Sequence, residues 1–364
     1  MLEKADSLAI TPGVAIYVVS AVLATIVVMK LFNSADKKDE IYSDMNHVAF
    51  NVRPPTTAWL NMGYWSTPPD HTQFVDAAEQ LATRLHQAVF PPFAPRCSEP
   101  LAILDVGCGS GDSVLLLNRT LQPQTLHGVT SIDSHASFAR KRLEQASSSA
   151  GQRDLDHDVF CGDAVQFLAP GRNSTKYDAV FALDCAYHFN DRPTFFRNAF
   201  AHLKPGGSIA LVDMALAWPY PTSQSVAAFE FVPSTSLDPP SRPPTRAQAL
   251  WHWISCQGAS TPTSHFVPID VYASHLHQAG FGDIKIEDIS EHVFPGFANF
   301  LASQGRYVTP DEAQWRVKGN PLLNFGFRVV GNNVVAKWAA GGDAGMIRCV
   351  LVSARKPEPT NGQQ

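Results

Sequence analysis

The sequence lacks an excess of basic residues. Lys and Arg number 28 against 33 Asp and Glu, which gives a formal net charge of -5 at pH 7 and an isoelectric point near 6.2. The basic side chains are scattered along the chain, whereas proteins that bind nucleic acids concentrate them on one face. We therefore expect no nucleic acid among the partners of this protein.

Cysteine pairs are also missing. The six cysteines form no C-x-x-C pair, and no histidines accompany them at the spacing of a zinc site. These residues are Cys97, Cys108, Cys161, Cys185, Cys256 and Cys349. The sequence therefore predicts neither a metal site nor a disulfide framework, and unpaired cysteines are typical of a reducing, cytosolic environment.

Charged residues are absent from Ser7 to Met29. A helix of about 20 apolar residues spans the hydrocarbon core of a bilayer, which is about 30 Å thick. A cleaved signal peptide is the competing interpretation, but only Lys4 is basic before the run and no A-x-A cleavage site follows it. We predict an N-terminal segment, 1–32, with an uncleaved transmembrane helix over about residues 12–32.

The lysines near this segment indicate its orientation. Lys30, Lys37 and Lys38 follow the predicted span, whereas Lys4 alone precedes it. Because positive charge accumulates on the cytosolic side of membrane proteins, we expect the rest of the chain to face the cytosol. Residues 33–60 are expected to form a juxtamembrane linker.

Beyond about residue 100, short apolar strands alternate with helical segments, as in a parallel sheet with crossover helices. Residues at helical spacing predict a further helix from Phe74 to Val89. The expected strands cover residues 101–106, 125–130, 157–161, 177–183, 208–214, 284–290 and 346–353. A Pro/Ser/Thr-rich insertion at about 218–268, which holds Trp251 and Trp253, is predicted to form a substrate cap with flexible parts. The tail 358–364 is predicted to be disordered.

Three glycines follow the first of these strands. Gly107, Gly109 and Gly111 come directly before a helical pattern that begins at Ser113. Glycines at such a bend let the backbone approach a ligand closely and present its amides at the start of a helix. Nicotinamide dehydrogenases also place a glycine-rich loop after their first strand, but their G-x-G-x-x-G spacing is not matched and no acidic residue ends the second strand.

The G-x-G-x-G spacing, with Asp105 two positions ahead, resembles the first motif of class I S-adenosylmethionine-dependent methyltransferases. Four further blocks follow in the order of that family. They are Leu126-His-Gly-Val-Thr130, Cys161-Gly-Asp-Ala164, the stretch from Tyr177 to Phe189, and Leu203-Lys-Pro-Gly-Gly207. The resemblance extends over a methyltransferase domain at 61–357. It implies a Rossmann-like α/β fold with a mostly parallel, seven-stranded sheet flanked by helices.

Two blocks outside the sheet narrow the resemblance. Asn61-Met-Gly-Tyr-Trp65 and the stretch from Tyr272 to Phe281 are similar to the small-molecule branch that includes sterol, tocopherol and macrolide methyltransferases. This similarity implies S-adenosylmethionine as the cofactor and a small-molecule or lipid acceptor.

Residue-by-residue comparison with the family implies a cofactor site. Asp163 is expected to accept from the adenine amino group, and Ala164 to offer its backbone amide. Most class I members end the second strand with an acidic residue that binds the ribose, whereas Thr130 stands there in this chain and the nearest carboxylate is Asp133. The methionine end is expected to contact Asp105 and the backbone of Gly107, Cys108, Gly109 and Gly111.

Tyr64 and Trp65 are expected beside the cofactor. An aromatic face attracts a neighbouring sulfonium or quaternising nitrogen through cation–π interaction. Ordinary packing in the core is the alternative for both side chains.

Asp184, Tyr187 and His188 follow the fourth strand, on a loop that overhangs the carboxyl edge of an open parallel sheet, where ligands bind. Methyl transfer is a displacement in which the protein aligns, dehydrates and, where required, deprotonates the acceptor. We expect His188 to act as the base, and Asp184 to orient it or to stabilise positive charge on the acceptor. The alternative is that Asp184 caps the next helix and His188 merely packs.

These observations predict a methyltransferase that acts on oxygen, nitrogen or carbon of a small, fairly apolar acceptor. A lipid, sterol, terpenoid or polyketide would be concentrated in the bilayer beside a membrane-anchored enzyme. A lipid headgroup-amine N-methyltransferase is the nearest alternative. An alternative of a different class is a membrane-tethered pseudoenzyme that binds the cofactor as a sensor or scaffold.

Overall fold

The computed structural model describes residues 57–65, 74–92, 100–149, 155–221, 225–226, 229–258, 261–303 and 321–359. The predicted transmembrane helix, residues 33–56 of the predicted linker and residues 360–364 of the predicted tail lie outside these ranges. Among the helices within them, none combines the length and the apolar character needed to cross a bilayer.

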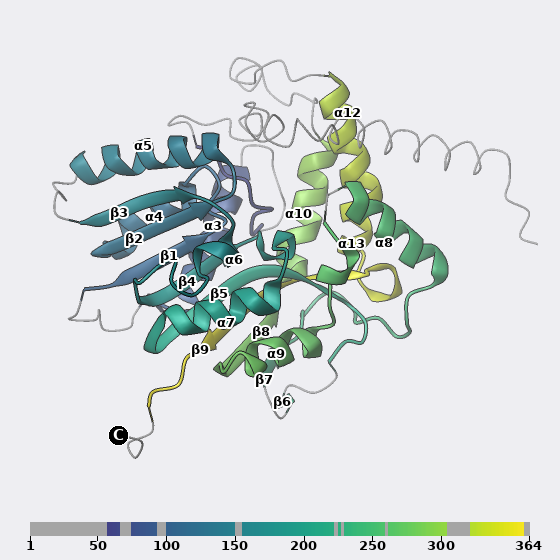
Figure 1. Ribbon diagram of the computed structural model, residues 1–364. Helices are drawn as coiled ribbons and strands as arrows, with labels where there is room; N and C mark the ends of the chain where they lie inside the picture. The colour runs from purple at the N-terminus through teal and green to yellow at the C-terminus, as the bar shows by residue number, and fades with distance from the viewer. Residues whose placement is uncertain are drawn as a thin grey trace, which may run out of the picture.

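A mixed sheet with the strand order β3-β2-β1-β4-β5-β9-β8-β7-β6 forms the centre of the structure (Figure 1). The strands are β1 (Ala102–Val106), β2 (Thr125–Thr130), β3 (Asp156–Cys161), β4 (Tyr177–Leu183), β5 (Leu203–Leu216), β6 (Ser225–Val226), β7 (Phe229–Val232), β8 (Gly282–Asp288) and β9 (Ile347–Arg355). Strands β1 to β5 are parallel to one another, whereas β9 runs antiparallel to both β5 and β8. The order reverses between β1 and β4, and ligands of open parallel sheets bind at such a switch point.

The expected number of seven strands was wrong, because the described part of the sheet contains nine. All seven expected strands are present, and the two additional ones, β6 and β7, come from the insertion that we expected to be cap alone. Phe229 and Phe231 alternate with Glu230, and both rings are buried. This period of two is typical of a half-buried strand, but the pairing of β7 with β6 and with the edge of β8 depends on the tertiary structure.

Helices cover the two faces of the sheet (Figure 1). One layer contains α3 (Phe74–Gln87), α4 (Asp112–Leu121) and α5 (Asp133–Ser149), and the other contains α6 (Ala164–Phe167), α7 (Arg192–His202) and α9 (Ile269–Gln278). Side chains of β1 alternate between the layers: Ile103 packs with the first, and Leu104 and Val106 pack with the second. The side chains on both faces of the sheet are apolar because helices cover both faces.

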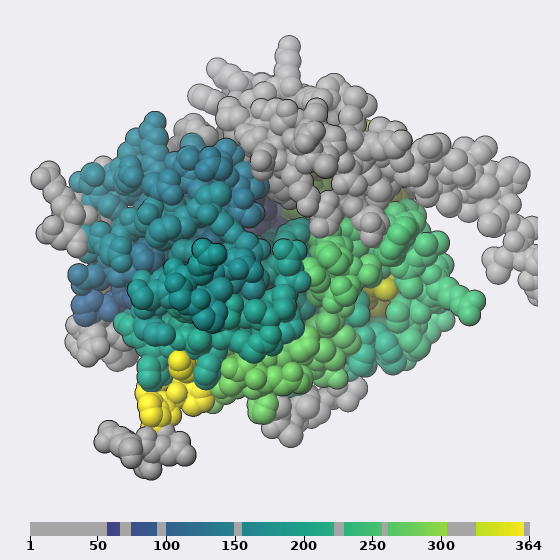
Figure 2. Space-filling view, viewed as in Figure 1, coloured from purple at the N-terminus to yellow at the C-terminus, as the bar shows by residue number. Residues whose placement is uncertain are grey.

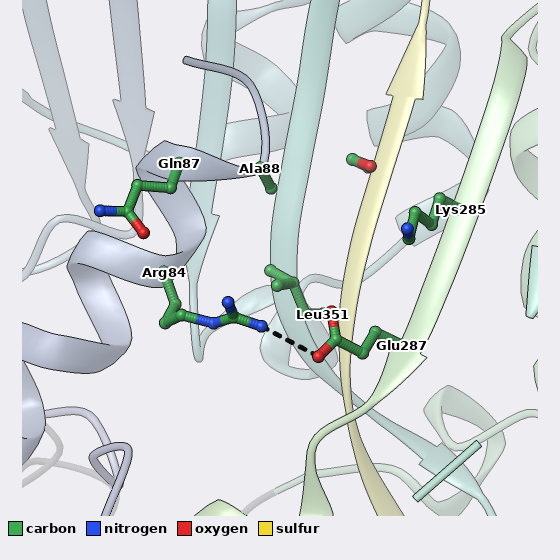
Figure 3. A pocket seen from close by; sticks show the side chains of 7 residues that line it. Arg84, Gln87, Ala88, Lys285, Glu287 and Leu351 are labelled. Atoms are coloured by element: carbon green, nitrogen blue, oxygen red, sulfur yellow. Dashed lines mark hydrogen bonds and ion pairs between the residues drawn. The ribbon is translucent and has the colours of Figure 1, made fainter. Parts of the chain in front are cut away.

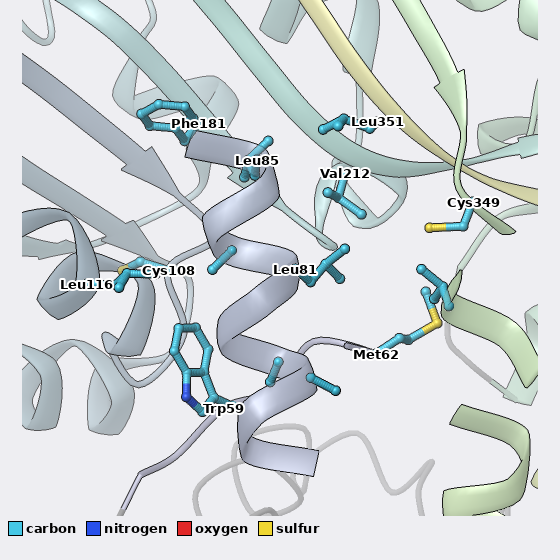
Figure 4. Close-up of a cluster of buried hydrophobic side chains, with 14 of the residues drawn as sticks. Trp59, Met62, Leu81, Leu85, Cys108, Leu116, Phe181, Val212, Cys349 and Leu351 are labelled. Atoms are coloured by element: carbon cyan, nitrogen blue, oxygen red, sulfur yellow. The ribbon is translucent and has the colours of Figure 1, made fainter. Parts of the chain in front are cut away.

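Helix α3 confirms the helix expected after Phe74. Its residues Leu81 and Leu85 are fully buried, and they point at Phe181, Val212 and Leu351 of the sheet (Figure 4). Apolar side chains four positions apart lie on one face of a helix. Burying a leucine side chain contributes about 1.5–3 kcal/mol, so this face holds α3 on the sheet.

A helical cap stands beside the sheet. It consists of α8 (Arg246–Gly258), α10 (Ser290–Ala302), α12 (Pro321–Val330), the π-helical turn η6 (Gly331–Val335) and α13 (Ala336–Ala339). In Figure 2 the green residues of α8 lie on the right of the molecule, away from the teal residues of the sheet domain. Helix α10 begins directly after the carboxyl end of β8, which brings the cap to the carboxyl edge of the parallel strands. The cap thus contains C-terminal helices as well as part of the insertion at 218–268.

Candidate active site

The loop between β1 and α4 has the backbone geometry of a ligand-binding turn. Gly107, Gly109 and Gly111 have φ angles of 71°, 52° and 93°, in the left-handed region that side chains with a Cβ rarely adopt. Gly111 is the N-cap of α4, and no side chain caps the helix. The first backbone N–H groups of α4 are therefore presented to a ligand, as at other anion-binding helix starts.

Asp105 lies beneath this loop with one carboxylate oxygen unpaired. Its side chain is buried, Oδ2 accepts a hydrogen bond from the Ser113 hydroxyl, and Oδ1 has no hydrogen-bond partner among the residues that the structure describes. Burial raises the pKa of Asp105 to about 7. A buried acceptor without a donor is costly, so the orphaned oxygen fits a cationic or hydrogen-bonding ligand at this place.

The ends of β2 and β3 adjoin the glycine loop. The N–H groups of Gly107 and Cys108 both donate to the carbonyl of Val129, one residue before Thr130. Thr130 is buried, and its carbonyl accepts from the N–H of Gly162 over 2.9 Å. The structure therefore brings three of the predicted binding segments to one edge of the sheet.

The other predicted residues at this edge differ in exposure. Asp133 is the first residue of α5 and is exposed. Asp163 is the N-cap of α6, where its Oδ1 accepts from the Gln166 N–H over 2.9 Å, and Ala164 is buried. The roles of these residues toward ribose and adenine remain predictions.

Asp184 directly follows β4 and has a left-handed conformation with φ of 55°. Its Oδ2 accepts from the Met62 N–H over 2.8 Å, and its Oδ1 accepts from the Tyr187 hydroxyl over 3.2 Å. Burial raises the pKa of Asp184 to about 7. Asp191, not Asp184, caps the next α-helix, so the alternative of a capping role for Asp184 was wrong.

His188 lies in the short 3-10 helix η4 (Ala186–His188), with its side chain exposed. Its Nδ1 lies 3.0 Å from the Oγ1 of Thr261, which comes from the insertion. The expectation that Asp184 orients His188 needs correction, because the carboxylate of Asp184 is directed at Met62 and Tyr187. Within the described part of the chain, the Nδ1 of His188 hydrogen-bonds to Thr261, which no local sequence signal indicated.

Residues 57–65, the N-terminal strap, cross the carboxyl edge of the sheet. The Ala58 N–H donates to Asp112 at the start of α4, and Leu60 lies so close to Gly109 that a Cβ there would be 2.9 Å from the leucine Cδ1. The backbone N–H of Met62 then donates a hydrogen bond to the carboxylate of Asp184. Residues 57–60, which we placed in the linker, are therefore part of the domain, and they were missed as neighbours of the glycine loop.

Tyr64 and Trp65 pack against α10, and their place beside the cofactor stays a prediction. Trp65 is buried against Phe300 and Gly296, and its backbone N–H donates to the carbonyl of His292 over 2.7 Å. Tyr64 stacks on His292 with 4.5 Å between ring centroids. Both side chains thus attach the strap to α10, and the packing alternative accounts for them.

A buried ion pair supports the catalytic loop from below. The Arg192 Nη1 donates to Asp213 Oδ2 over 2.8 Å, and its Nη2 donates to the carbonyl of His265 over 2.6 Å. The hydroxyl of Tyr272 donates to the same Asp213 oxygen. His265 in turn contacts the carbonyl of Tyr187 through Nδ1 at 2.8 Å. This network joins β5, α7, α9 and the insertion, and the sequence did not indicate it.

Two hollows lie away from the predicted site. One, of about 250 Å³, lies between the end of α3 and strands β8 and β9, and the Arg84–Glu287 ion pair of 2.9 Å crosses it (Figure 3). The other, of about 50 Å³, lies within the helical cap beside Trp251 and Trp338. None of the predicted site residues lines either hollow.

Comparison with known proteins identifies the fold and its chemistry. Residues 70–286 match the sequence profile of a family described as a methyltransferase domain. The chain belongs to this methyltransferase family. It is an S-adenosylmethionine-dependent methyltransferase that acts on small molecules, and its fold is the Rossmann-like α/β fold of class I.

Two curated relatives are similar over most of the domain. The chain is 27% identical over 243 residues to the erythromycin 3''-O-methyltransferase of Saccharopolyspora erythraea, which covers 67% of this chain and 68% of the relative. It is also 27% identical over 240 residues to the 27-O-demethylrifamycin SV methyltransferase of Amycolatopsis mediterranei, covering 65% and 72%. Among solved structures, the [4+2]-cyclase SpnF superposes with a TM-score of 0.54 at 19% identity, covering 88% of this chain and 97% of that one.

The residues at the carboxyl edge fit S-adenosylmethionine. The uncapped start of α4 and the unpaired Oδ1 of Asp105 offer donors and an acceptor for the methionine end. Ionised carboxylates of Asp105 and Asp184 would attract a positive charge placed beside them. When bound, this cofactor supplies an electrophilic methyl group on a sulfonium centre.

Proposed function

We propose that the protein transfers the methyl group to a hydroxyl oxygen of a small, fairly apolar acceptor. The observation that carries the proposal is the position of His188. Its ring is exposed at the carboxyl end of β4, beside Asp184 and the switch point of the sheet, and Thr261 hydrogen-bonds its Nδ1. A neutral alcohol is a poor nucleophile, so a positioned base at this place accelerates its alkylation.

The chemistry needs one proton transfer. The imidazole of His188 would accept the hydroxyl proton as the acceptor oxygen takes up the methyl group, which bound S-adenosylmethionine would supply from its sulfonium centre. The proton then leaves His188 for water. The protein otherwise aligns the two reactants and excludes water.

An apolar acceptor is supported by the side chains around the catalytic loop. The ring of Tyr187 stacks on Phe266 with 6.3 Å between centroids, and Phe266 contacts the ring of His252 edge-on at 5.0 Å. Phe266 and Cys256 are buried. The names of the two curated relatives, which describe methyl transfer to erythromycin and rifamycin derivatives, support a bulky oxygen acceptor.

The test measures transfer of radiolabelled methyl from S-adenosylmethionine into two panels of acceptors, apolar alcohols and lipid amines. We expect label in the alcohols, and a loss of about 100-fold or more in kcat for His188→Ala with unchanged cofactor affinity by calorimetry. Label in the amines with full activity of His188→Ala would support the headgroup N-methyltransferase instead. Binding of S-adenosylmethionine without transfer of label to any acceptor of the two panels would support the alternative of a cofactor-binding scaffold.

We further propose that residues 12–32 attach the enzyme to a membrane with the catalytic domain on the cytosolic side. The uncharged run from Ser7 to Met29 and the lysines after it support this proposal. A membrane-soluble acceptor would then be concentrated beside the site.

A further inference from the structure

We infer that the hollow of about 50 Å³ in the helical cap, the cap hollow, binds an apolar branch of the acceptor and so selects among acceptors. The inference rests on the proposed transfer to a small, fairly apolar acceptor, and it adds a place for the part of the acceptor that is remote from the methylated hydroxyl. Helix α8 forms one wall of the cap hollow, and η6 with α13 forms the other. Met346, directly before β9, also lines it.

The cap hollow adjoins the carboxyl edge of the sheet. The carbonyl of Met346 accepts a hydrogen bond over 2.9 Å from the N–H of Ala217, which directly follows β5. On the same strand, the carbonyl of Val212 accepts from the N–H of Asp184 over 2.9 Å. Strand β5 therefore joins the cap hollow to the catalytic loop at the edge where ligands of open parallel sheets bind.

A row of aromatic rings leads from the cap hollow to the catalytic loop. His252 lines the hollow, and its ring contacts Phe266 edge-on with 5.0 Å between centroids. Phe266 in turn stacks on Tyr187 at 6.3 Å. Both separations are those of rings in direct contact. A bulky acceptor that lies along these rings, with its hydroxyl at His188, therefore reaches the hollow with its far end.

Two indole rings form the walls of the cap hollow. The ring of Trp251 lies beneath the Lys337 ammonium, with 4.5 Å between Nζ and the ring centroid. This cation–π contact joins α8 to α13 across the hollow. The ring of Trp338 is held from behind by Phe294 of α10, at 5.3 Å between centroids. Both walls are thus fixed by contacts that do not need an acceptor.

The polar side chains of the lining have partners within the protein. Gln248, Ser255 and Asn333 each donate a side-chain hydrogen bond to a backbone carbonyl of the cap. A bound water molecule needs about two to four polar partners, whereas these donors are already engaged. The cap hollow therefore suits an apolar group better than a polar one.

The size of the cap hollow limits the branch that it can hold. One water-sized group needs about 10–15 Å³, so a hollow of about 50 Å³ holds roughly three or four carbon atoms. The turn η6 that bounds it is π-helical, a rare element that occurs frequently at functional sites. A Cβ at Gly331 would lie 2.8 Å from the backbone nitrogen of Ala302, so glycine lets this turn pack closely on α10.

The experiment measures kcat/KM for radiolabelled methyl transfer to cyclohexanols that differ only in a para-alkyl branch, from hydrogen to pentyl. We expect the original protein to prefer a branch of about propyl size. Ser255→Leu fills the cap hollow and is expected to lower kcat/KM about tenfold for the propyl compound, but less than about twofold for cyclohexanol itself. Trp253→Leu, on the exposed side of α8, is the matched control and is expected to leave the series unchanged.

Met346→Ala changes the cap hollow in the opposite direction. It enlarges the hollow and is expected to move the preferred branch from propyl towards pentyl, which a merely structural role would not do. The inference is overturned by an equal loss along the whole series in Ser255→Leu, or by an unchanged preference in Met346→Ala.

Failure of the proposed function gives a different result. If label enters amines and not alcohols, the comparison is made with para-alkylated cyclohexylamines, and the same dependence on the branch is expected. If no compound takes label, calorimetry measures binding of the alcohols in the presence of S-adenosylhomocysteine. Weaker binding of the propyl compound alone in Ser255→Leu would then support the inference, and equal binding by Ser255→Leu and the original protein would overturn it.

Discussion

The backbone N–H of Met62 donates to Oδ2 of Asp184 over 2.8 Å, although the two residues are 122 positions apart. This bond joins the N-terminal strap to the end of β4. Between its bonds to α4 and β4 the strap passes over the glycine loop, where Leu60 lies against Gly109. The carboxylate that we expected to serve the acceptor thus also holds the cover of the cofactor site.

Replacing Asp184 is expected to release the strap. Asp184→Ala leaves the Met62 N–H and the Tyr187 hydroxyl without their acceptor, whereas Asp184→Asn keeps one acceptor oxygen and tolerates the left-handed backbone. We expect Asp184→Ala to weaken binding of S-adenosylmethionine about tenfold and Asp184→Asn to weaken it less, as measured by calorimetry. Equal affinity of Asp184→Ala and the original protein would contradict the role assigned to this bond.

The free energy of unfolding is expected to depend on pH through Asp105. Burial raises the pKa of Asp105 to about 7, so between about pH 4 and pH 7 the folded state binds more protons than the unfolded state. Its contribution to stability is therefore present at low pH and is lost as the pH rises through 7. His86, whose pKa burial lowers to about 3, contributes the opposite slope.

The difference between the original protein and Asp105→Asn isolates this contribution. Asn has a similar volume and does not titrate, so urea unfolding of both proteins at pH 5 and pH 8 removes the effect of His86. We expect the stability of Asp105→Asn relative to the original protein to be greater at pH 8 than at pH 5. A constant difference would show that Asp105 has the same pKa in both states.

Gly109→Ala is expected to disturb cofactor binding more than folding. The new Cβ would combine a φ of 52° with a contact to Leu60, and the strain costs about 1 kcal/mol. Displacement of Leu60 is expected to raise the Kd for S-adenosylmethionine about tenfold. Gly171→Ala is the matched control, because Gly171 has a φ of 78° with no atom near its Cβ position. The idea fails if the two variants bind the cofactor equally well.

Arg192→Met is expected to destabilise the protein by about 3–5 kcal/mol, because it leaves Asp213 as an uncompensated charge in the core. The exposed pair of Arg119 and Glu79 provides the control, and Arg119→Met is expected to cost about 1 kcal/mol or less. Urea unfolding of both variants measures the difference. Similar losses in the two variants would show that burial of the Arg192 pair is not important for stability.

Membrane attachment is tested by placing charge within the predicted span. Val22→Asp with Ile26→Asp adds about 2.5–3.5 kcal/mol per carboxylate to the cost of insertion. After extraction of membranes with alkali, we expect the double variant to be lost from the membrane fraction. The control Ser7→Asp lies outside residues 12–32 and is expected to remain in that fraction. Identical distribution of the original protein and both variants would contradict the predicted anchor.

Local sequence patterns were sufficient to predict much of the fold. Apolar runs bounded by turn residues predicted β1, β2, β4 and the other expected strands, and the apolar period predicted α3. The glycine loop was predictable because its left-handed turns need particular residues within a few positions. The missed strands β6 and β7 are short and lie in a segment rich in proline and serine, and their pairing depends on the edge of β8.

The sequence by itself determined the family and the cofactor, and it predicted the edge of the sheet at which the site lies, because these follow from residues that are close together in the chain. Only the tertiary structure decided which groups meet across that edge. Met62 reaches Asp184, Thr261 reaches His188, and Trp65 turns toward α10. Such pairs are set by the packing of distant elements, and no periodicity or short motif encodes them.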